Sequence, residues 1–218
     1  MIDTKYSVDN LFIQIEGLYA ITPDELDTAE LLGKVRLALL GGTQVLQYRN
    51  KTADAKLKLR QAQALRQLTR EFKTTFIVND DAHLAAQVEA DGVHLGGEDG
   101  SVAAARALLG GTGIIGVSCY NHGSLAHEAV RQGADYVAFG AFFPSGVKPD
   151  AVKADMQLLQ TARRELNVPI VAIGGIMQQN SAALIEAGAD ALAVISALWN
   201  APDIEKSAQG FSTLFSRT

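Results

Sequence analysis

The sequence has little of what marks disulfide-bonded, zinc-binding or membrane proteins. Cys119 is its one cysteine in 218 residues, so no internal disulfide can form, and CxxC or Cys/His zinc spacing is absent. No apolar run approaches the roughly 20 residues that a membrane-spanning helix needs. The segment from Met1 to Asn10 lacks the basic start and apolar stretch of a secretion signal. We therefore expect a cytoplasmic protein.

Basic residues are in the minority as well. The chain has 19 Lys and Arg against 24 Asp and Glu, which gives a formal net charge of −5. Broad nucleic-acid binding depends on clustered Lys and Arg, so we expect small-molecule partners and neither nucleic acid nor a membrane. The composition and length suit one globular domain. We expect it to span residues 1–218, with roughly the first 15 residues as an N-terminal extension.

Short apolar or β-branched runs alternate with longer segments whose apolar residues recur at helical spacing, as Leu32, Val35 and Leu39 do. Eight runs are candidate strands: Leu18–Thr22, Thr43–Arg49, Thr75–Asn79, Gly92–Leu95, Ile114–Ser118, Asp135–Gly140, Pro169–Gly174 and Asp190–Ser196. This alternation implies a parallel sheet covered by helices, and eight strands close naturally into a (β/α)8 TIM barrel. An open doubly wound sheet would usually show GxGxxG after the first strand, where this chain has Ile21-Thr22-Pro23-Asp24.

A loosely repeated phrase supports this division of the chain. Glu89-Ala90-Asp91-Gly92, Gly133-Ala134-Asp135 and Gly188-Ala189-Asp190 each stand just before a candidate strand. Glycine there suits the position after a helix end, where a positive φ is needed. A last helix is expected near Asp203–Phe215.

Acidic residues follow two neighbouring strands, at the end of a barrel where active sites are built. Asn79-Asp80-Asp81 follows the third strand and Glu98-Asp99 the fourth. Each alone is explained as a helix N-cap. Together, oxygen ligands on adjacent loops are typical of a Mg²⁺ site that keeps several waters, and the pair therefore favours metal binding.

Cations and glycines gather at the same end. Alternation along an extended segment points Gln47, Arg49 and Lys51 to one side, where an amide and two cations suit a diphosphate. Lys148, in the loop after the sixth strand, would add a third cation. Each of these charges alone is explained as a solvated loop residue. Gly174-Gly175 and Ile195-Ser196 follow the seventh and eighth strands, where this fold often binds phosphate, although two glycines also simply turn a chain.

The histidines and the cysteine point to no further chemistry. His94 lies within a strand and is expected to be packed and hydrogen-bonded, whereas His83, His122 and His127 are expected on helix surfaces. Cys119 has no evident partner base, so we do not expect a nucleophilic thiol.

Seven stretches, in this order and spacing, resemble the thiamine-phosphate synthase family over nearly the whole chain. They are Gln47–Lys51, Phe76–Asp81, Ala90–Asp99, Ile115–Ser118, Phe142–Lys148, Ile173–Ile176 and Val194–Ser196. The resemblance implies a barrel enzyme that joins 4-amino-2-methyl-5-hydroxymethylpyrimidine diphosphate to a thiazole phosphate, in its carboxylated form, and releases pyrophosphate.

The resemblance also implies roles for individual residues. Mg²⁺ would be bound by Asp80 and Asp99. The pyrimidine diphosphate would be held by Gln47, Tyr48, Arg49, Asn50, Lys51, Asn79, Ser118 and Lys148, among which Arg49, Lys51, Lys148 and Ser118 would be catalytic. The thiazole phosphate would be held by Ser145, Gly146, Val147, Gly175, Ile195 and Ser196.

Two departures from the family pattern keep related functions open. The family loop commonly has threonine where this chain has Val147, and often has histidine where this chain has Tyr120. A related thiazole tautomerase uses a histidine in that region, so Tyr120 favours the synthase. A thiamine-phosphate-binding protein without turnover and a phosphosugar epimerase stay open as well. Barrels of this kind often form homodimers, although no residue here indicates one.

Overall fold

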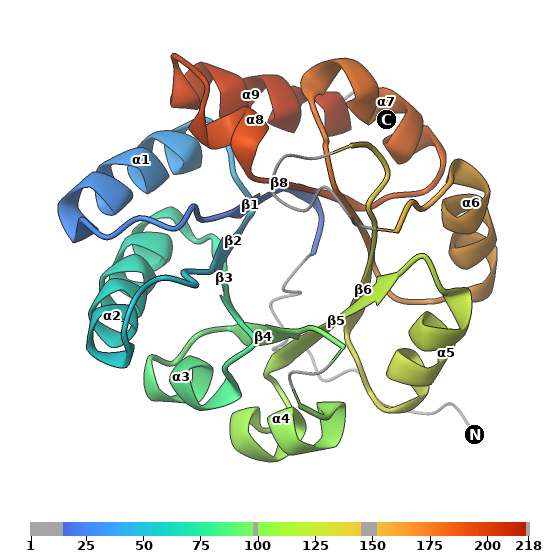
Figure 1. The fold of residues 1–218 in the computed structure, drawn as a ribbon, viewed down its shortest axis with the longest axis horizontal. Helices are drawn as coiled ribbons and strands as arrows, with labels where there is room; N and C mark the ends of the chain where they lie inside the picture. Colours follow the sequence, from blue (N-terminus) through green and yellow to red (C-terminus); the bar gives the residue numbers. More distant parts are fainter. Residues whose placement is uncertain (1–14, 98–99, 145–151, 217–218) are drawn as a thin grey trace, which may run out of the picture.

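The computed structural model describes residues 15–97, 100–144 and 152–216, and its eight strands close into a parallel barrel. Each strand pairs with its neighbours in the sequence, and the last strand pairs with the first. Figure 1 looks down this ring of strands, with the helices outside it. The strands are β1 (Gly17–Ile21), β2 (Val45–Tyr48), β3 (Thr75–Asn79), β4 (Gly92–Leu95), β5 (Ile114–Tyr120), β6 (Tyr136–Phe139), β7 (Ile170–Ile173) and β8 (Ala191–Val194).

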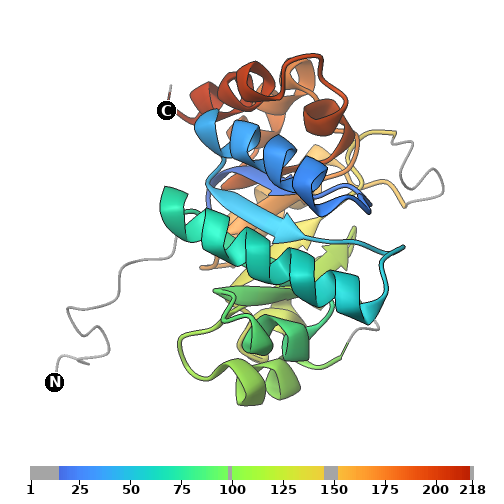
Figure 2. The same cartoon turned by 90° about the vertical axis from the view of Figure 1, so that its left-hand side faces the viewer.

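A helix follows every strand along the chain and packs on the outside of the barrel. The helices are α1 (Thr28–Leu40), α2 (Ala55–Phe72), α3 (Ala82–Gln87), α4 (Val102–Leu109), α5 (Gly123–Arg131), α6 (Met156–Glu165), α7 (Gln178–Glu186), the short α8 (Ser196–Trp199) and α9 (Ile204–Phe215). Figure 2 shows α1 and α2 side by side against the strands. Within the described ranges, no helix is long and apolar enough to cross a membrane.

The predicted TIM barrel is confirmed, with small shifts at strand ends. The fifth strand extends to Tyr120, two residues beyond its predicted end, and the eighth ends at Val194 because α8 begins at Ser196. The last helix begins at Ile204, with Asp203 as its N-cap, as expected. The carboxyl ends of all the strands meet at one mouth.

The strands separate two apolar cores because successive side chains point to opposite faces. On β1, Leu18 and Ala20 face the helices, whereas Tyr19 and Ile21 face the barrel interior. The outer core lies between strands and helices and is the larger. The inner core is small, and toward the mouth of the barrel the inward-facing side chains are polar.

The repeated phrase turns the chain from a helix into the next strand. Gly133 and Gly188 follow the ends of α5 and α7 with φ of 95° and 110°. Glu89 occupies the corresponding position after α3 with φ of 53°. The expected left-handed residue is therefore present in all three units, once without glycine.

The aspartate of each phrase ties two neighbouring strands together at the amino end of the barrel. Each accepts a backbone N–H from the preceding strand: Asp91 from Phe76 at 2.7 Å, Asp135 from Ile115 at 2.7 Å, and Asp190 from Ile170 at 2.8 Å. Each also pairs with an arginine of a nearby helix, namely Arg66, Arg106 and Arg163. We call these three the strand-tying aspartates.

Candidate functional site

A pocket of about 690 Å³ opens at the carboxyl ends of the strands. Seven of the predicted substrate residues line it: Gln47, Arg49, Asn79, Ser118, Gly175, Ile195 and Ser196. They come from several different strand ends, and β2 and β8 each contribute two of them. The predicted residues Asp99, Ser145, Gly146, Val147 and Lys148 lie outside the described residues.

Arg49 is held at the pocket by the end of β1. Its backbone N–H donates to Thr22 Oγ1, and its carbonyl accepts from the same hydroxyl, both at 2.9 Å. Its guanidinium lies 3.4 Å from Asp24, and its side chain is 17% exposed. Because Asp24 contacts only one terminal nitrogen of the guanidinium, Arg49 has further N–H donors for a ligand in the pocket.

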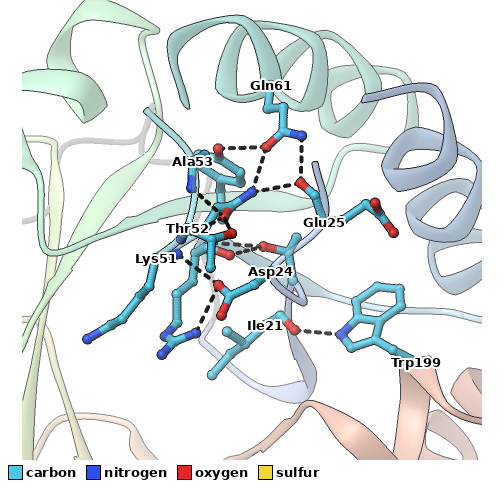
Figure 3. Close-up of polar contacts among 12 residues, drawn as sticks. Ile21, Asp24, Glu25, Lys51, Thr52, Ala53, Gln61 and Trp199 are labelled. Carbon is cyan, nitrogen blue, oxygen red and sulfur yellow. Dashed lines mark hydrogen bonds and ion pairs between the residues drawn. The ribbon is translucent and has the colours of Figure 1, made fainter. Parts of the chain in front are cut away.

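Lys51 lies further out than the sequence predicts. Its backbone N–H donates to Asp24 Oδ1 at 2.8 Å, whereas its side chain is exposed and does not line the pocket. Figure 3 shows Asp24 meeting this segment from the loop after β1. Alternation fails at Lys51 because β2 ends at Tyr48 and the chain bends after Asn50.

Two other predicted residues, Tyr48 and Asn50, do not line the pocket, and their side chains bond to neighbouring segments. Tyr48 faces the helices, and its hydroxyl donates to Gln61 Oε1 at 2.9 Å. Asn50 is buried and donates to the carbonyl of Glu25 at 2.7 Å and to Gln61 at 3.1 Å. Gln61, on α2, itself donates to that carbonyl of Glu25 at 2.9 Å. These bonds fasten the loops after β1 and β2 to α2 (Figure 3).

Another part of the pocket lining comes from the segments that follow β7 and β8. Gly175 has φ of 62°, and a Cβ there would lie 2.4 Å from the carbonyl oxygen of Pro144. Only glycine therefore allows this close approach of the two loops. Trp199 donates from Nε1 to the carbonyl of Ile21 and so anchors α8 (Figure 3). The first residue of α8, Ser196, borders the pocket. The first N–H groups of a helix lack intrahelical acceptors, which suits an anion.

A chain of buried hydrogen bonds crosses the barrel beneath the pocket. Gln47 Nε2 donates to the hydroxyl of Tyr19 at 2.8 Å, and this hydroxyl lies 2.8 Å from that of Tyr136. His94 then bridges Tyr136 and Ser118, each at 2.9 Å. We call these five residues the barrel chain. His94 is packed and hydrogen-bonded, as expected, whereas the two tyrosines were not predicted.

Asp80 is the described member of the predicted metal pair. It follows β3 in a left-handed conformation, with φ of 63°, and its backbone N–H donates to the carbonyl of His94 at 2.8 Å. It is half-buried but does not line the pocket. A carboxylate held at a strand end is a hard oxygen donor that suits Mg²⁺. Among the described residues, no group of three or more His, Cys, Asp or Glu side chains gathers as a metal site.

Tyr120 joins the ends of β5 and β4 at the rim. Its hydroxyl accepts from the backbone N–H of Gly97 at 3.2 Å, and the residue is 44% exposed beside the pocket. Its φ of 52° is uncommon for a bulky residue. The residue that departs from the family pattern therefore borders the pocket and contacts the loop after β4.

Cys119 is expected to resist alkylation in the folded protein. It is fully buried, and burial raises the pKa of its thiol to about 12. At neutral pH the reactive thiolate is therefore scarce and shielded from reagent. Mass spectrometry after iodoacetamide treatment should find the native protein unlabelled and the urea-unfolded protein fully labelled. Stoichiometric labelling without unfolding would show that this part of β5 opens.

The fold and the pocket together define a class of protein. A closed parallel barrel whose mouth is lined by an arginine, amides, a hydroxyl, a glycine and the start of a helix has the architecture of a TIM-barrel enzyme, whose active site lies at this end. The family model described as "Thiamine monophosphate synthase" matches residues 18–198. The chain belongs to this family of thiamine-phosphate synthases.

Individual relatives agree with the family model. The thiamine-phosphate synthase of Methylobacillus flagellatus is 58% identical over 201 residues, which cover 92% of this chain and 96% of the relative. That of Nitrosomonas eutropha is 52% identical over 203 residues, 93% of this chain and 96% of the relative. The solved structure of thiamine phosphate pyrophosphorylase from Pyrococcus furiosus is 34% identical, with a TM-score of 0.83 and coverage of 92% and 96%.

Proposed function

We propose that the chain condenses 4-amino-2-methyl-5-hydroxymethylpyrimidine diphosphate with the thiazole phosphate, in its carboxylated form, to give thiamine phosphate, pyrophosphate and carbon dioxide. The observation that carries this assignment is that one pocket holds two groups of anion-binding residues. Arg49, Gln47 and Asn79 line it from the ends of β2 and β3, and Gly175 and Ser196 line it from the ends of β7 and β8. A pocket that must hold a diphosphate and a monophosphate at once needs two such groups.

The reaction requires no protein nucleophile. The pyrimidine's 4-amino group can push electrons into the ring as the C–O bond to diphosphate breaks, which leaves a stabilised methylene cation. The thiazole nitrogen then forms the new C–N bond, and the diphosphate keeps the electron pair of the bond that broke. The carboxylate of the thiazole leaves as carbon dioxide, and the ring carbon that keeps its electron pair takes up a proton. The raised pKa of the buried Cys119 thiol, which keeps it from acting as a nucleophile, is consistent with this route.

The chain's own residues would act by charge and position. Arg49 would stabilise the charge that develops on the departing diphosphate, with Lys51 and Lys148 as further cations. Gln47, Asn79 and Ser118 would orient the pyrimidine, and Gly175 and Ser196 would hold the thiazole phosphate in line. Mg²⁺, held by Asp80 and Asp99, would add positive charge against the same leaving group. Tyr48 and Asn50 would complete the predicted diphosphate-binding segment, held in place by their bonds to Gln61 and Glu25.

The test is pyrophosphate release by the purified enzyme with Mg²⁺ and both substrates, and then with each substrate omitted. Release that requires both substrates, together with thiamine phosphate detected by mass, is the expected result. Tight binding of thiamine phosphate without turnover would instead identify a binding protein.

Asp80→Asn is expected to raise the Mg²⁺ concentration needed for half-maximal activity by about 10–100-fold, a loss typical even of residues that only support a metal ligand. Asparagine tolerates the left-handed conformation at this position, so the variant removes charge without straining the backbone. Mn²⁺ binding, followed by electron paramagnetic resonance, gives a readout that is independent of turnover. An unchanged Mn²⁺ affinity would remove Asp80 from the metal site.

A further inference from the structure

Tyr136 is central to the barrel chain but does not touch the pocket. It is fully buried on β6, and its ring stacks on His94 with centroids 5.5 Å apart. A Cβ on Gly116 of β5 would lie 2.0 Å from Tyr136 Cζ, so the glycine leaves the space that the ring fills. The ring is thereby fixed with its hydroxyl between Tyr19 and His94.

One direction of donation gives every member of the barrel chain a donor and an acceptor. With Gln47 Nε2 donating to the hydroxyl of Tyr19, that hydroxyl can donate its own proton to Tyr136. Tyr136 would then donate to Nδ1 of His94, and His94, with its proton on Nε2, would donate to Ser118 Oγ. Burial raises the pKa of both phenols, which keeps each one protonated and able to donate.

We propose that Tyr136 is a positioning residue that fixes this direction and so sets what the two ends of the barrel chain offer a ligand. Gln47, with its nitrogen engaged, offers its carbonyl as an acceptor, and Ser118, already accepting from His94, offers its hydroxyl proton. An acceptor and a donor match the amino N–H and the neighbouring ring nitrogen of a 4-aminopyrimidine. The 4-oxo analogue presents the reverse pattern, with a carbonyl that accepts and a ring N–H that donates. This match rests on the proposed pyrimidine site, whereas the direction of the barrel chain does not.

The tautomer of His94 reports the direction. In protein labelled with nitrogen-15 histidine, long-range proton–nitrogen spectra distinguish a proton on Nε2 from one on Nδ1, and His94→Gln identifies the signal. We expect the Nε2–H form in the wild type. In Tyr136→Phe, which keeps the ring and removes the hydroxyl, Nδ1 loses its donor and the two tautomers should mix. The Nδ1–H form in the wild type would overturn the proposal.

Ligand selectivity gives the second readout. The unreactive pyrimidine alcohol, which lacks the diphosphate, and its 4-oxo analogue are titrated by calorimetry. The wild type is expected to prefer the amino compound, and Tyr136→Phe to narrow this preference by about tenfold, the scale of one net hydrogen bond. The matched control is Thr43→Val, which also deletes a buried hydroxyl, bonded to Ala38 at 2.8 Å, at the far end of the barrel.

The outcomes distinguish the role of Tyr136 in the barrel chain from the proposed pyrimidine site. Thr43→Val should keep both the His94 tautomer and the selectivity of the wild type, so that a general loss of stability is not mistaken for a loss of direction. An unchanged tautomer and selectivity in Tyr136→Phe would overturn the role of Tyr136. A wild type with Nε2–H His94 that binds neither pyrimidine would keep the direction of the barrel chain and overturn the proposed pyrimidine site.

Discussion

Arg49→Ala is expected to lower kcat by about 10²–10³, the cost of removing one preorganised donor from developing negative charge. The guanidinium is mostly buried at the pocket wall, and its backbone is fixed by Thr22 through both its N–H and its carbonyl. It therefore needs little reorganisation when the diphosphate departs. The measurement is single-turnover pyrophosphate release at saturating Mg²⁺, which separates the chemical step from product release.

Two further variants sharpen this result. Arg49→Lys keeps the charge but loses the planar fork, one edge of which meets Asp24, and should fall between the alanine variant and the wild type. Arg36→Ala removes an exposed arginine of α1 that pairs with Glu71, and should leave kcat unchanged. Wild-type turnover in Arg49→Ala would exclude the residue from the diphosphate site.

Asp91→Ala is expected to destabilise the folded state by about 3 kcal/mol, because it leaves two kinds of donor without their acceptor. The carboxylate accepts from Phe76 N at 2.7 Å and from both terminal nitrogens of Arg66 at 2.8 Å. The side chain of Asp91 is 20% exposed and that of Arg66 is 15% exposed. Urea unfolding, followed by circular dichroism, gives the change in the free energy of unfolding.

The other strand-tying aspartates provide an internal comparison. Asp135 accepts the corresponding backbone bond from Ile115 but only one bond from Arg106, and its side chain is 44% exposed, so fewer bonds are lost and water replaces more of them. Asp135→Ala should therefore cost less than Asp91→Ala. Asp91→Asn keeps an oxygen for Phe76 and should lie between the wild type and alanine. Equal losses for Asp91→Ala and Asp135→Ala would show that neither burial nor the second arginine bond sets the effect.

The barrel and half of its mouth could be predicted from local patterns. Each strand is a short run of apolar or β-branched residues, and its end is visible because polar residues or glycine follow at once. The pocket residues Gln47 and Arg49 follow from simple alternation. Lys51 does not, because alternation holds only while the strand continues. Tyr48 and Asn50 entered through the family resemblance and face the other way.

The barrel chain could not be predicted in the same way. Tyr19, His94 and Tyr136 belong to three strands, and their contacts depend on which residues lie at the same height inside the barrel. That height is set by the pairing register, in which Gly116 lies opposite Tyr136 and Tyr19 opposite Val45. A polar aromatic residue at an inward position of a strand was the available signal, but it does not name the partner.

The strand-tying aspartates have a consequence for how this chain tolerates change. They act at the amino end of the barrel, whereas Arg49, Gly175 and Ser196 act at the mouth, and the two sets share no contact in the described hydrogen bonds and ion pairs. Free-energy changes at distant, unconnected sites add. Strengthening the amino end would therefore raise the free energy of unfolding without altering the pocket. A chain stabilised in this way would stay folded with destabilising substitutions at the mouth, including those that change substrate preference.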